Sequence, residues 1–177
     1  MVDKIAKEQA TSIFKEYSSY VFQTALLLTN SRTLADDITQ ETFIQVFKKF
    51  YTFDSTKSVK PWIYKVTLNI SRNIIRKQKW LKFTGNIPDT IDKYNVEEDI
   101  LKNEEDMELW QEIIKLPLKS KELIVLHFYA GLKLKEIADI LNIPIGTCKS
   151  RLNTALKTLR KNMPLGFNTG GDSIETI

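Results

Sequence analysis

The sequence predicts an all-α protein with two small helical domains, an acidic linker between them, and a helix-turn-helix in the C-terminal domain. Residues that could face a core recur at spacings of three and four along most of the chain, whereas strand-like alternation is scarce. A length of 177 residues, 42% of them hydrophobic, allows two small domains with a thin core each. Acidic residues gather between the two helical parts, as expected of a solvated linker.

Charge is segregated along the chain, although the net charge is only +4. Residues 57–88 include eight basic and no acidic residues, residues 89–108 include nine acidic and two basic ones, and residues 109–177 include ten basic and six acidic ones. This segregation favours a polyanion as the partner of the basic parts. A solvated basic face that binds nothing is the alternative.

Composition also indicates the compartment. No apolar run reaches the roughly 18 residues that span a bilayer, and the first ten residues mix charges instead of forming a signal-peptide core. Cys148 is the only cysteine, so the chain cannot form an intramolecular disulfide, in keeping with a reducing compartment. We therefore expect a cytoplasmic protein.

The helices of the first part are predicted at about residues 13–28, 34–50 and 62–82. Helical spacing defines the first two through Ile13, Tyr17, Val21, Thr24 and Leu28, then Leu34, Ile38, Phe43, Val46, Phe47 and Phe50. Pro61 suits the start of the third helix, because its fixed φ is already helical. After Pro117, further helices are predicted at residues 120–130, 133–141 and 145–162. The expected division is a first domain, an acidic linker, a second domain and a flexible tail, at residues 1–83, 84–106, 107–163 and 164–177.

The last two predicted helices form a helix-turn-helix. Gly131 ends the preceding helix well, since glycine tolerates the left-handed conformation of a C-terminal cap. Only residues 142–144 connect the last two helices, and Asn142 is suited to positive φ at such a turn. A short connection followed by a basic helix is typical of DNA-binding hairpins. The alternative is a helical hairpin whose basic face is solvated and binds no DNA.

The final helix has one apolar and one polar face. Cys148, Leu152 and Leu159 lie on the apolar face. On the other, Gly146 lets backbone amides approach a phosphate, and Lys149 and Arg151 can neutralise phosphates. The side chains suited to base edges in the major groove are Ser150 and Asn153.

The run EIADILNIPIGTCKSRL resembles the DNA-binding C-terminal domain of bacterial RNA polymerase sigma factors, whose pattern is approximately EIAxxLGIPxGTVKSRLxRAxxxLR. Asn142 replaces the usual glycine and Cys148 a packing valine, while Lys133 stands where a serine helix cap is frequent. Asn153 and Thr154 replace positions that are often His and Arg. A similar motif occurs in response-regulator effector domains. The resemblance implies minus-35 DNA contacts by Gly146, Thr147, Lys149, Ser150, Arg151, Asn153, Thr154 and Lys157.

One face of the predicted second helix is polar except for an isoleucine. It carries Asp37, Gln40, Glu41, Ile44 and Lys48 at spacings of three and four, and an exposed isoleucine there is a mild sign of a protein partner. The stretch LADDITQETFIQVFKKF resembles the sigma-factor segment AEDLVQETFLRAWxxF, which docks on the clamp helices of the largest polymerase subunit. The resemblance implies core-polymerase contacts by Asp37, Gln40, Glu41 and Ile44.

A cationic ridge runs along the predicted third helix. Lys65, Asn69, Arg72, Arg76 and Lys79 fall within an arc of about 80°. Such a ridge can follow a phosphate backbone, and the apolar opposite side suits a core. A membrane-surface helix would have the same amphipathicity and is the alternative.

Rings and lysines alternate in the loop before that helix. Phe53, Lys57, Lys60 and Trp62 together suit the capture of an unstacked base, unless the rings simply belong to the core. PWIYKVTLN resembles the family stretch WLYRIARN, in a helix that recognises and melts the promoter minus-10 element. Thr67 and Leu68 replace Ala and Arg of that stretch. The resemblance implies minus-10 contacts by Phe53, Lys57, Lys60, Lys65, Asn69, Arg72 and Arg76.

Nothing in the sequence indicates an enzyme. The one histidine, His127, lies in an apolar run and suits packing or capping, and Cys148 has no evident base nearby. There is no Walker loop, dinucleotide fingerprint or metal-ligand cluster. We therefore expect no catalysis, no cofactor, no metal and no small-molecule substrate.

The resemblance covers about residues 10–82 and 107–162, in the order of a two-domain, extracytoplasmic-function (ECF) sigma factor. It implies a promoter-specificity subunit for a stress or envelope regulon, with core RNA polymerase and promoter DNA as partners. It also implies an inhibitory anti-sigma factor, in that family often tethered to the membrane. The alternatives are a DNA-binding regulator that does not join polymerase, and an interaction protein whose surfaces bind only proteins.

Overall fold

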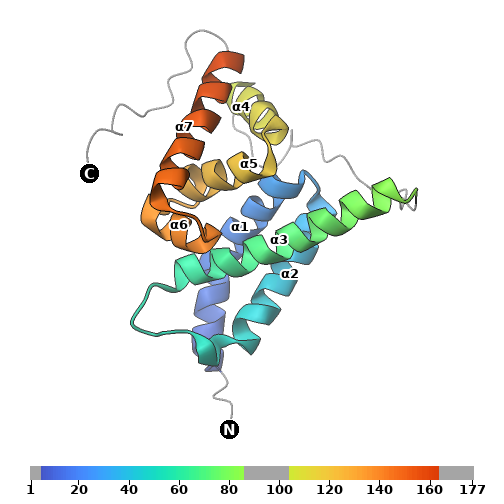
Figure 1. Cartoon of the computed structure of the whole chain (residues 1–177). Helices are drawn as coiled ribbons and strands as arrows, with labels where there is room; N and C mark the ends of the chain where they lie inside the picture. Colours follow the sequence, from blue (N-terminus) through green and yellow to red (C-terminus); the bar gives the residue numbers. More distant parts are fainter. Residues whose placement is uncertain (1–4, 86–103, 164–177) are drawn as a thin grey trace.

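The computed structural model describes residues 5–85 and 104–163, and every regular element within these ranges is helical. The predicted all-α class is therefore confirmed (Figure 1). Most of the predicted acidic linker and the whole predicted tail lie outside the described residues. Within the two described ranges, no helix has both the length and the apolar character needed to cross a membrane.

Three long helices and one short turn make up the N-terminal half, which here means residues 5–85. They are α1 (Lys7–Thr29), α2 (Arg32–Lys48), the 3-10 turn η1 (Phe50–Thr52) and α3 (Val59–Phe83). The connection from α1 to α2 is tight because Asn30 adopts φ 52° and its N–H donates to the Leu26 carbonyl. Ser31 then caps α2, its Oγ accepting from the Leu34 N–H at 3.4 Å. These helices correspond to the three predicted ones.

The C-terminal half, residues 104–163, contains four α-helices and one π-helical segment. They are α4 (Glu104–Lys115), α5 (Leu118–Ile124), η3 (Val125–Tyr129), α6 (Leu134–Leu141) and α7 (Ile145–Asn162). Helix α4 was not predicted, and it begins inside the segment assigned to the linker. Its acidic start obscured the helical spacing of Trp110, Ile113 and Ile114, which are buried or half-buried against the core.

The segment predicted as a helix at residues 120–130 is helical from Leu118 to Tyr129, but the type of helix changes within it. The chain is α-helical only to Ile124, and then makes a π-helical turn in which the Ala130 N–H donates to the Val125 carbonyl at 2.9 Å. A π turn accommodates one more residue than an α turn, which hydrophobic spacing does not reveal. Gly131, at φ 66°, ends the segment in the left-handed conformation expected of it.

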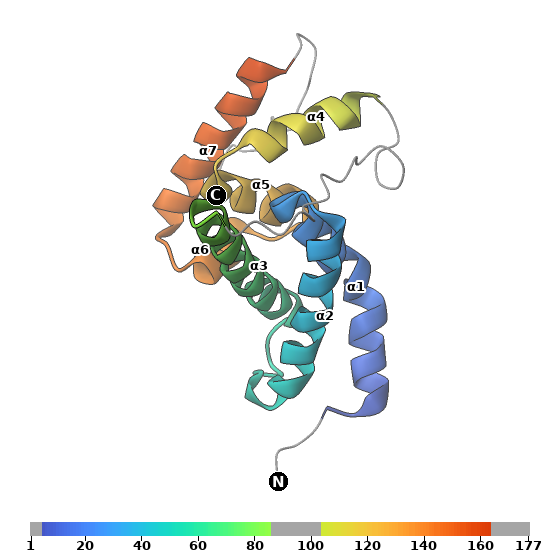
Figure 2. The ribbon, with the colours of Figure 1, turned by 90° about the vertical axis from the view of Figure 1, so that its right-hand side faces the viewer.

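Helix α3 lies between the α1–α2 pair and the C-terminal helices, as the two perpendicular views show together (Figures 1 and 2). The larger buried cluster draws on both halves, including Leu26, Ile38, Tyr64, Leu68, Leu123, Leu126, Ile137 and Leu152. A second cluster lies wholly in the N-terminal half and includes Ile13, Val21, Phe43, Val46 and Ile63. The expectation of one thin core per half is thus wrong, because the main core is shared.

The helix-turn-helix connection has the predicted conformation. Asn142 adopts φ 53° after α6, and its N–H donates to the Ala138 carbonyl. The Ile143 N–H donates to the same carbonyl at 3.0 Å, so two donors close the end of α6. The turn to α7 therefore depends on a left-handed residue at position 142.

Replacing Asn142 tests this turn. Asn142→Gly should leave the free energy of unfolding unchanged or raise it by up to about 1 kcal/mol, because glycine adopts positive φ without a Cβ clash. Asn142→Val should lower it by about 1–2 kcal/mol, since a β-branched residue is strained there. Urea denaturation measures both changes.

Asn153→Val is the matched control, because Asn153 is exposed within α7 and valine and asparagine have similar helix propensities. Its effect should stay within about 0.5 kcal/mol. Equal losses at positions 142 and 153 would contradict the left-handed turn.

Candidate nucleic-acid interface

The cationic ridge of α3 lies on the side of the helix away from the N-terminal core. Lys65, Asn69, Arg76 and Lys79 are exposed, and Arg72 is half-buried. Buried residues occupy the other side, namely Ile63, Tyr64, Thr67, Leu68 and Ser71. The predicted ridge therefore exists as a continuous surface feature of one helix.

The two positions at which α3 departs from the family stretch are both in the core. Thr67 is fully buried and its hydroxyl donates to the Ile63 carbonyl at 3.0 Å. Leu68 is 1% exposed and belongs to the shared core. An arginine at position 68 would bury a charge, so leucine here has a packing role and takes no part in the exposed ridge.

Aromatic rings organise the loop before α3. Trp62 is half-buried against the second core cluster, and its ring centroid lies 5.2 Å from that of Phe53 and 6.0 Å from that of Phe50. The core role considered for Trp62 is thus present. Phe53 and Trp62 also line a cavity of about 570 Å³ together with Lys57 and Lys65. Phe53 and Lys57 of the loop therefore meet Trp62 and Lys65 of α3 at one cavity, a combination suited to base capture, whereas the predicted Lys60 does not line it.

Asp54 shapes this loop and was not among the predicted site residues. Its Oδ1 accepts from the backbone N–H of Thr56 at 3.1 Å and from the Thr56 hydroxyl at 2.7 Å, and Lys57 Nζ lies 3.4 Å from Oδ2. The two hydrogen bonds from Thr56, followed by Lys57, hold the pKa of the Asp54 carboxyl below its usual value. The sequence DST at residues 54–56 is typical of such a turn, because an aspartate side chain can accept a hydrogen bond from the backbone two residues further on.

The polar face of α7 is open to solvent over most of its length. Lys149, Ser150 and Asn153 are exposed. Gly146, Thr154 and Lys157 are exposed as well, while Thr147 and Arg151 are half-buried. On the other face Cys148 is fully buried, and burial raises the pKa of its thiol.

Gly146 lies in the first turn of α7, where backbone N–H groups have no intrahelical partner. The preceding Pro144 supplies no side-chain cap. Nothing lies within 4 Å of the position that a Cβ on Gly146 would occupy, so intramolecular packing does not require glycine there. The observation fits an approach by an external phosphate, for which a bare backbone leaves room.

The predicted polymerase-binding face lies on the outside of α2. Asp37 and Gln40 are exposed, and Ile44 is 57% exposed. Glu41 is half-buried, and its Oε1 accepts from Gln45 Nε2 at 2.8 Å. The structure thus offers an exposed apolar side chain among carboxylates and amides, which suits a protein partner.

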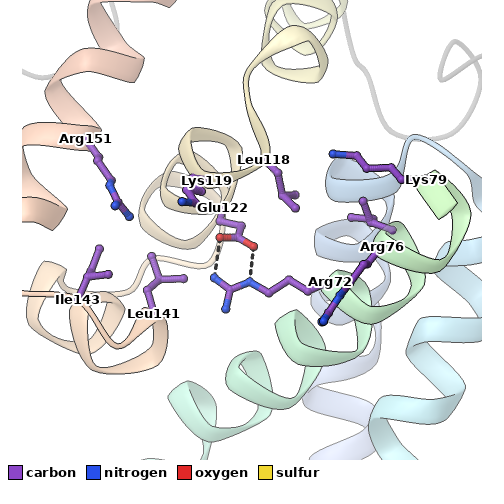
Figure 3. A pocket seen from close by; sticks show the side chains of 10 residues that line it. Arg72, Arg76, Lys79, Leu118, Lys119, Glu122, Leu141, Ile143 and Arg151 are labelled. Atoms are coloured by element: carbon purple, nitrogen blue, oxygen red, sulfur yellow. Dashed lines mark hydrogen bonds and ion pairs between the residues drawn. The ribbon is translucent and has the colours of Figure 1, made fainter. Parts of the chain in front are cut away.

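A second cavity, of about 480 Å³, lies where α3 faces the C-terminal half (Figure 3). Its lining includes three cations of α3, two residues of α5 and one of α7, namely Arg72, Arg76, Lys79, Lys119, Glu122 and Arg151. One residue of the predicted α7 surface, Arg151, therefore lines the same cavity as residues of the α3 ridge.

Arg72 and Glu122 form a bidentate ion pair across this boundary. Arg72 Nε donates to Glu122 Oε1 at 2.6 Å, and Nη2 donates to Oε2 at 2.7 Å (Figure 3). The Glu122 carboxylate, followed by a smaller opposing effect of burial, raises the pKa of the Arg72 guanidinium. Glu122 was not among the predicted site residues. The one sequence feature that could have indicated its role is its place as an acidic residue at the start of the apolar run ELIVLHF.

His127 has the packing role expected of it. The ring is half-buried beside Phe128, with centroids 4.8 Å apart, and Nδ1 lies 3.1 Å from the Leu132 carbonyl oxygen. This hydrogen bond joins the π-helical turn to the segment that leads into α6.

Two family profiles match the chain. The profile described as Sigma-70 region 2 matches residues 13–81, and that described as Sigma-70, region 4 matches residues 106–159. Among curated relatives, the ECF RNA polymerase sigma factor SigW of Bacillus subtilis is 29% identical, over 92% of this chain and 92% of its own length. RNA polymerase sigma factor SigV of the same organism is 33% identical, over 70% of this chain and 72% of its own length.

A solved structure has a similar fold. The sigma factor RpoE, in its co-crystal structure with the anti-sigma factor NepR from Bartonella quintana, aligns with a TM-score of 0.74 and 19% identity, over 89% of this chain and 98% of its own. The profile matches lie in the predicted order along the chain. The chain therefore belongs to the sigma-70 family of RNA polymerase sigma factors, in its ECF group.

Proposed function

We propose that this chain is an initiation factor that binds core RNA polymerase and directs transcription from a defined set of promoters. The observation that carries the proposal is the presence, in one chain, of the region 2 and region 4 matches, each with an exposed polar or cationic helix face. A regulator that binds DNA without polymerase would need no region 2. We place its action in the cytoplasm, where polymerase and promoter meet.

The α3 ridge and the preceding loop form the proposed minus-10 surface. Exposed Lys65, Asn69 and Arg76 support contacts to the DNA backbone. The cavity beside Phe53 and Trp62 supports capture of an unstacked base. Melting the duplex requires such a site, because a flipped base must find a partner that compensates for lost stacking.

The α7 face forms the proposed minus-35 surface. Lys149 and Lys157 are suited to phosphates, and Ser150 and Asn153 to base edges in the major groove. Region 4 is thus proposed to span residues 107–163, and region 2 residues 1–83. The acidic segment between them is proposed to act as a linker.

Two protein partners belong to the proposal. Core polymerase would bind the α2 face that exposes Asp37, Gln40 and Ile44. An inhibitory anti-sigma factor is the second partner, by analogy with the complex of RpoE and the anti-sigma factor NepR.

In vitro transcription on a genomic fragment library tests the proposal directly. The chain added to purified core polymerase should produce start sites that share two sequence elements, and core polymerase alone should not. Duplex binding without such initiation would favour the regulator, and neither activity would favour a protein-interaction module.

Ile44→Ser should weaken binding to core polymerase by about tenfold, because the substitution removes an apolar side chain from the centre of the proposed interface. Fluorescence anisotropy of the labelled chain, measured without DNA, gives the dissociation constant. Ile145→Ser is the matched control, since Ile145 is 47% exposed but lies on α7. Equal losses from both variants would argue against the α2 face.

Asn153→Ala should change which minus-35 bases are preferred and not merely weaken binding. A side-chain amide that makes a bidentate contact to adenine discriminates by about 1–3 kcal/mol, or roughly 5- to 150-fold. Selection of minus-35 sequences from a randomised promoter pool, with core polymerase present, measures this preference. An unchanged preference at lower affinity would remove Asn153 from base recognition.

A further inference from the structure

The cavity of about 480 Å³ between α3 and the C-terminal half has a strongly cationic lining. Its charged residues come from three helices, and they are Arg72, Arg76 and Lys79 of α3, Lys119 and Glu122 of α5, and Arg151 of α7. Glu122 is the one carboxylate among the described lining residues. Figure 3 shows Arg72 and Arg151 extending into the cavity from opposite sides. The cavity therefore collects positive charge from distant parts of the sequence.

Glu122 compensates only one of the five cations. Its two oxygens accept from Arg72 Nε and Nη2 at 2.6 and 2.7 Å, so the charges of this pair cancel. Arg76 Nη2 donates to the side-chain oxygen of Asn73 at 2.8 Å, but that amide is neutral and leaves the guanidinium charge uncompensated. Three further lining cations have no carboxylate of the described residues within ion-pair distance, and they are Lys79, Lys119 and Arg151. The lining thus presents four uncompensated positive charges.

This charge favours an anionic ligand with several phosphate groups. Cations that share one cavity repel one another, and a bound polyanion replaces that repulsion with attraction. Phosphate matches the residue types present, because guanidinium groups bind its oxygens through two parallel N–H groups and lysines bind it as point charges. The volume of the cavity lies within the range of about 300–1,000 Å³ that is typical of small-molecule sites.

The cavity also has an aliphatic floor, which consists of Ile75, Leu118, Leu141 and Ile143. All four side chains are half-buried and packed against the larger buried cluster. Small-molecule sites typically combine such apolar contact area with a few polar groups that fix the orientation of the ligand. An inorganic phosphate chain would leave the aliphatic floor uncovered, whereas a nucleobase can pack on it. The two features together favour a nucleoside polyphosphate.

We propose that this cavity is a binding site for a nucleoside polyphosphate, with the phosphates on its cationic residues and the base on its aliphatic floor. The phosphate contacts come from the four uncompensated cations, namely Arg76, Lys79, Lys119 and Arg151. Because α3 and α5 belong to different halves of the chain, the ligand contacts both halves at once. The site is additional to the proposed function, since Lys119 and the aliphatic floor belong to neither proposed DNA surface.

Lys119→Glu in the full chain tests the proposal, with Lys135→Glu as the matched control. Both lysines are exposed, and each is the second residue of its helix, α5 or α6. The two substitutions therefore change the net charge equally and have the same relation to a helix N-terminus, but only Lys119 lines the cavity. Anisotropy of ribose-labelled adenosine and guanosine triphosphates, titrated with each protein, gives the dissociation constants.

Lys119→Glu should weaken binding of both nucleotides by at least about tenfold, because a repulsive charge replaces an attractive one in the cavity. Lys135→Glu should stay within about twofold of the unaltered chain. Lys79→Glu, which alters the α3 side of the same cavity, should weaken binding as Lys119→Glu does. Unlabelled inorganic triphosphate should displace the nucleotides with several-fold lower affinity, because it leaves the aliphatic floor uncovered.

A random-sequence DNA duplex distinguishes a free nucleotide from DNA as the source of the phosphates. Lys119→Glu should weaken duplex binding no more than Lys135→Glu does, because both add the same charge outside the proposed DNA surfaces. If Lys119→Glu weakened duplex and nucleotide binding equally, the residue would serve DNA and the proposal would be overturned.

Three results with the nucleotides themselves would also overturn the proposal. The first is the absence of saturable binding to the unaltered chain. The second is an unchanged affinity in either Lys79→Glu or Lys119→Glu, since the site requires cations from both halves. The third is equal affinity for inorganic triphosphate and for the nucleotides, because the aliphatic floor would then take no part.

Discussion

A carboxylate that is almost fully buried needs a cation beside it, and the cation for Glu122 comes from the other half of the chain. The Glu122 side chain is 3% exposed, and that of Arg72 is 34% exposed. Removing one partner of such a pair leaves an uncompensated charge that costs several kcal/mol, so the two halves are electrostatically coupled while they are in contact. Arg72 retains contact with water, so only the carboxylate of the pair is almost fully shielded from solvent.

The shared core supports the same contact by different means. Leu68 on α3 and Leu123 on α5 are both buried in the larger cluster, so separation of the halves would expose apolar surface. Apolar burial stabilises the contact between the halves but depends little on which residues meet. The Arg72–Glu122 pair is directional, so it determines which face of α3 the C-terminal half covers.

Much of this architecture could be predicted from the sequence, because helices leave local signals. Periodicity placed the helices, the Asn142 turn and the exposed face of α7, all of which depend on residues within a few positions of one another. The acidic start of α4 concealed its apolar spacing. The contact between Arg72 and Glu122 spans 50 positions, and no periodic pattern indicates which of several cations a distant carboxylate will meet.

The exposed faces of the candidate site could be predicted as well, because helical spacing is also a local signal. Which side chains are exposed on α3 follows from helical spacing, but what faces them depends on how the halves pack. Position 68 illustrates the limit, since the family stretch has an arginine there and the structure places Leu68 in the core.

The central claim is that the Arg72–Glu122 ion pair couples the two halves of the chain. The most direct measurement is the distance between spin labels at Lys15→Cys on α1 and Lys161→Cys on α7, in a Cys148→Val background, by double electron–electron resonance. The labels should move apart in Glu122→Gln and keep their distance in Glu112→Gln, whose ion pair with Lys115 lies within α4. An unchanged distance in Glu122→Gln, or equal movement in both variants, would contradict the claim.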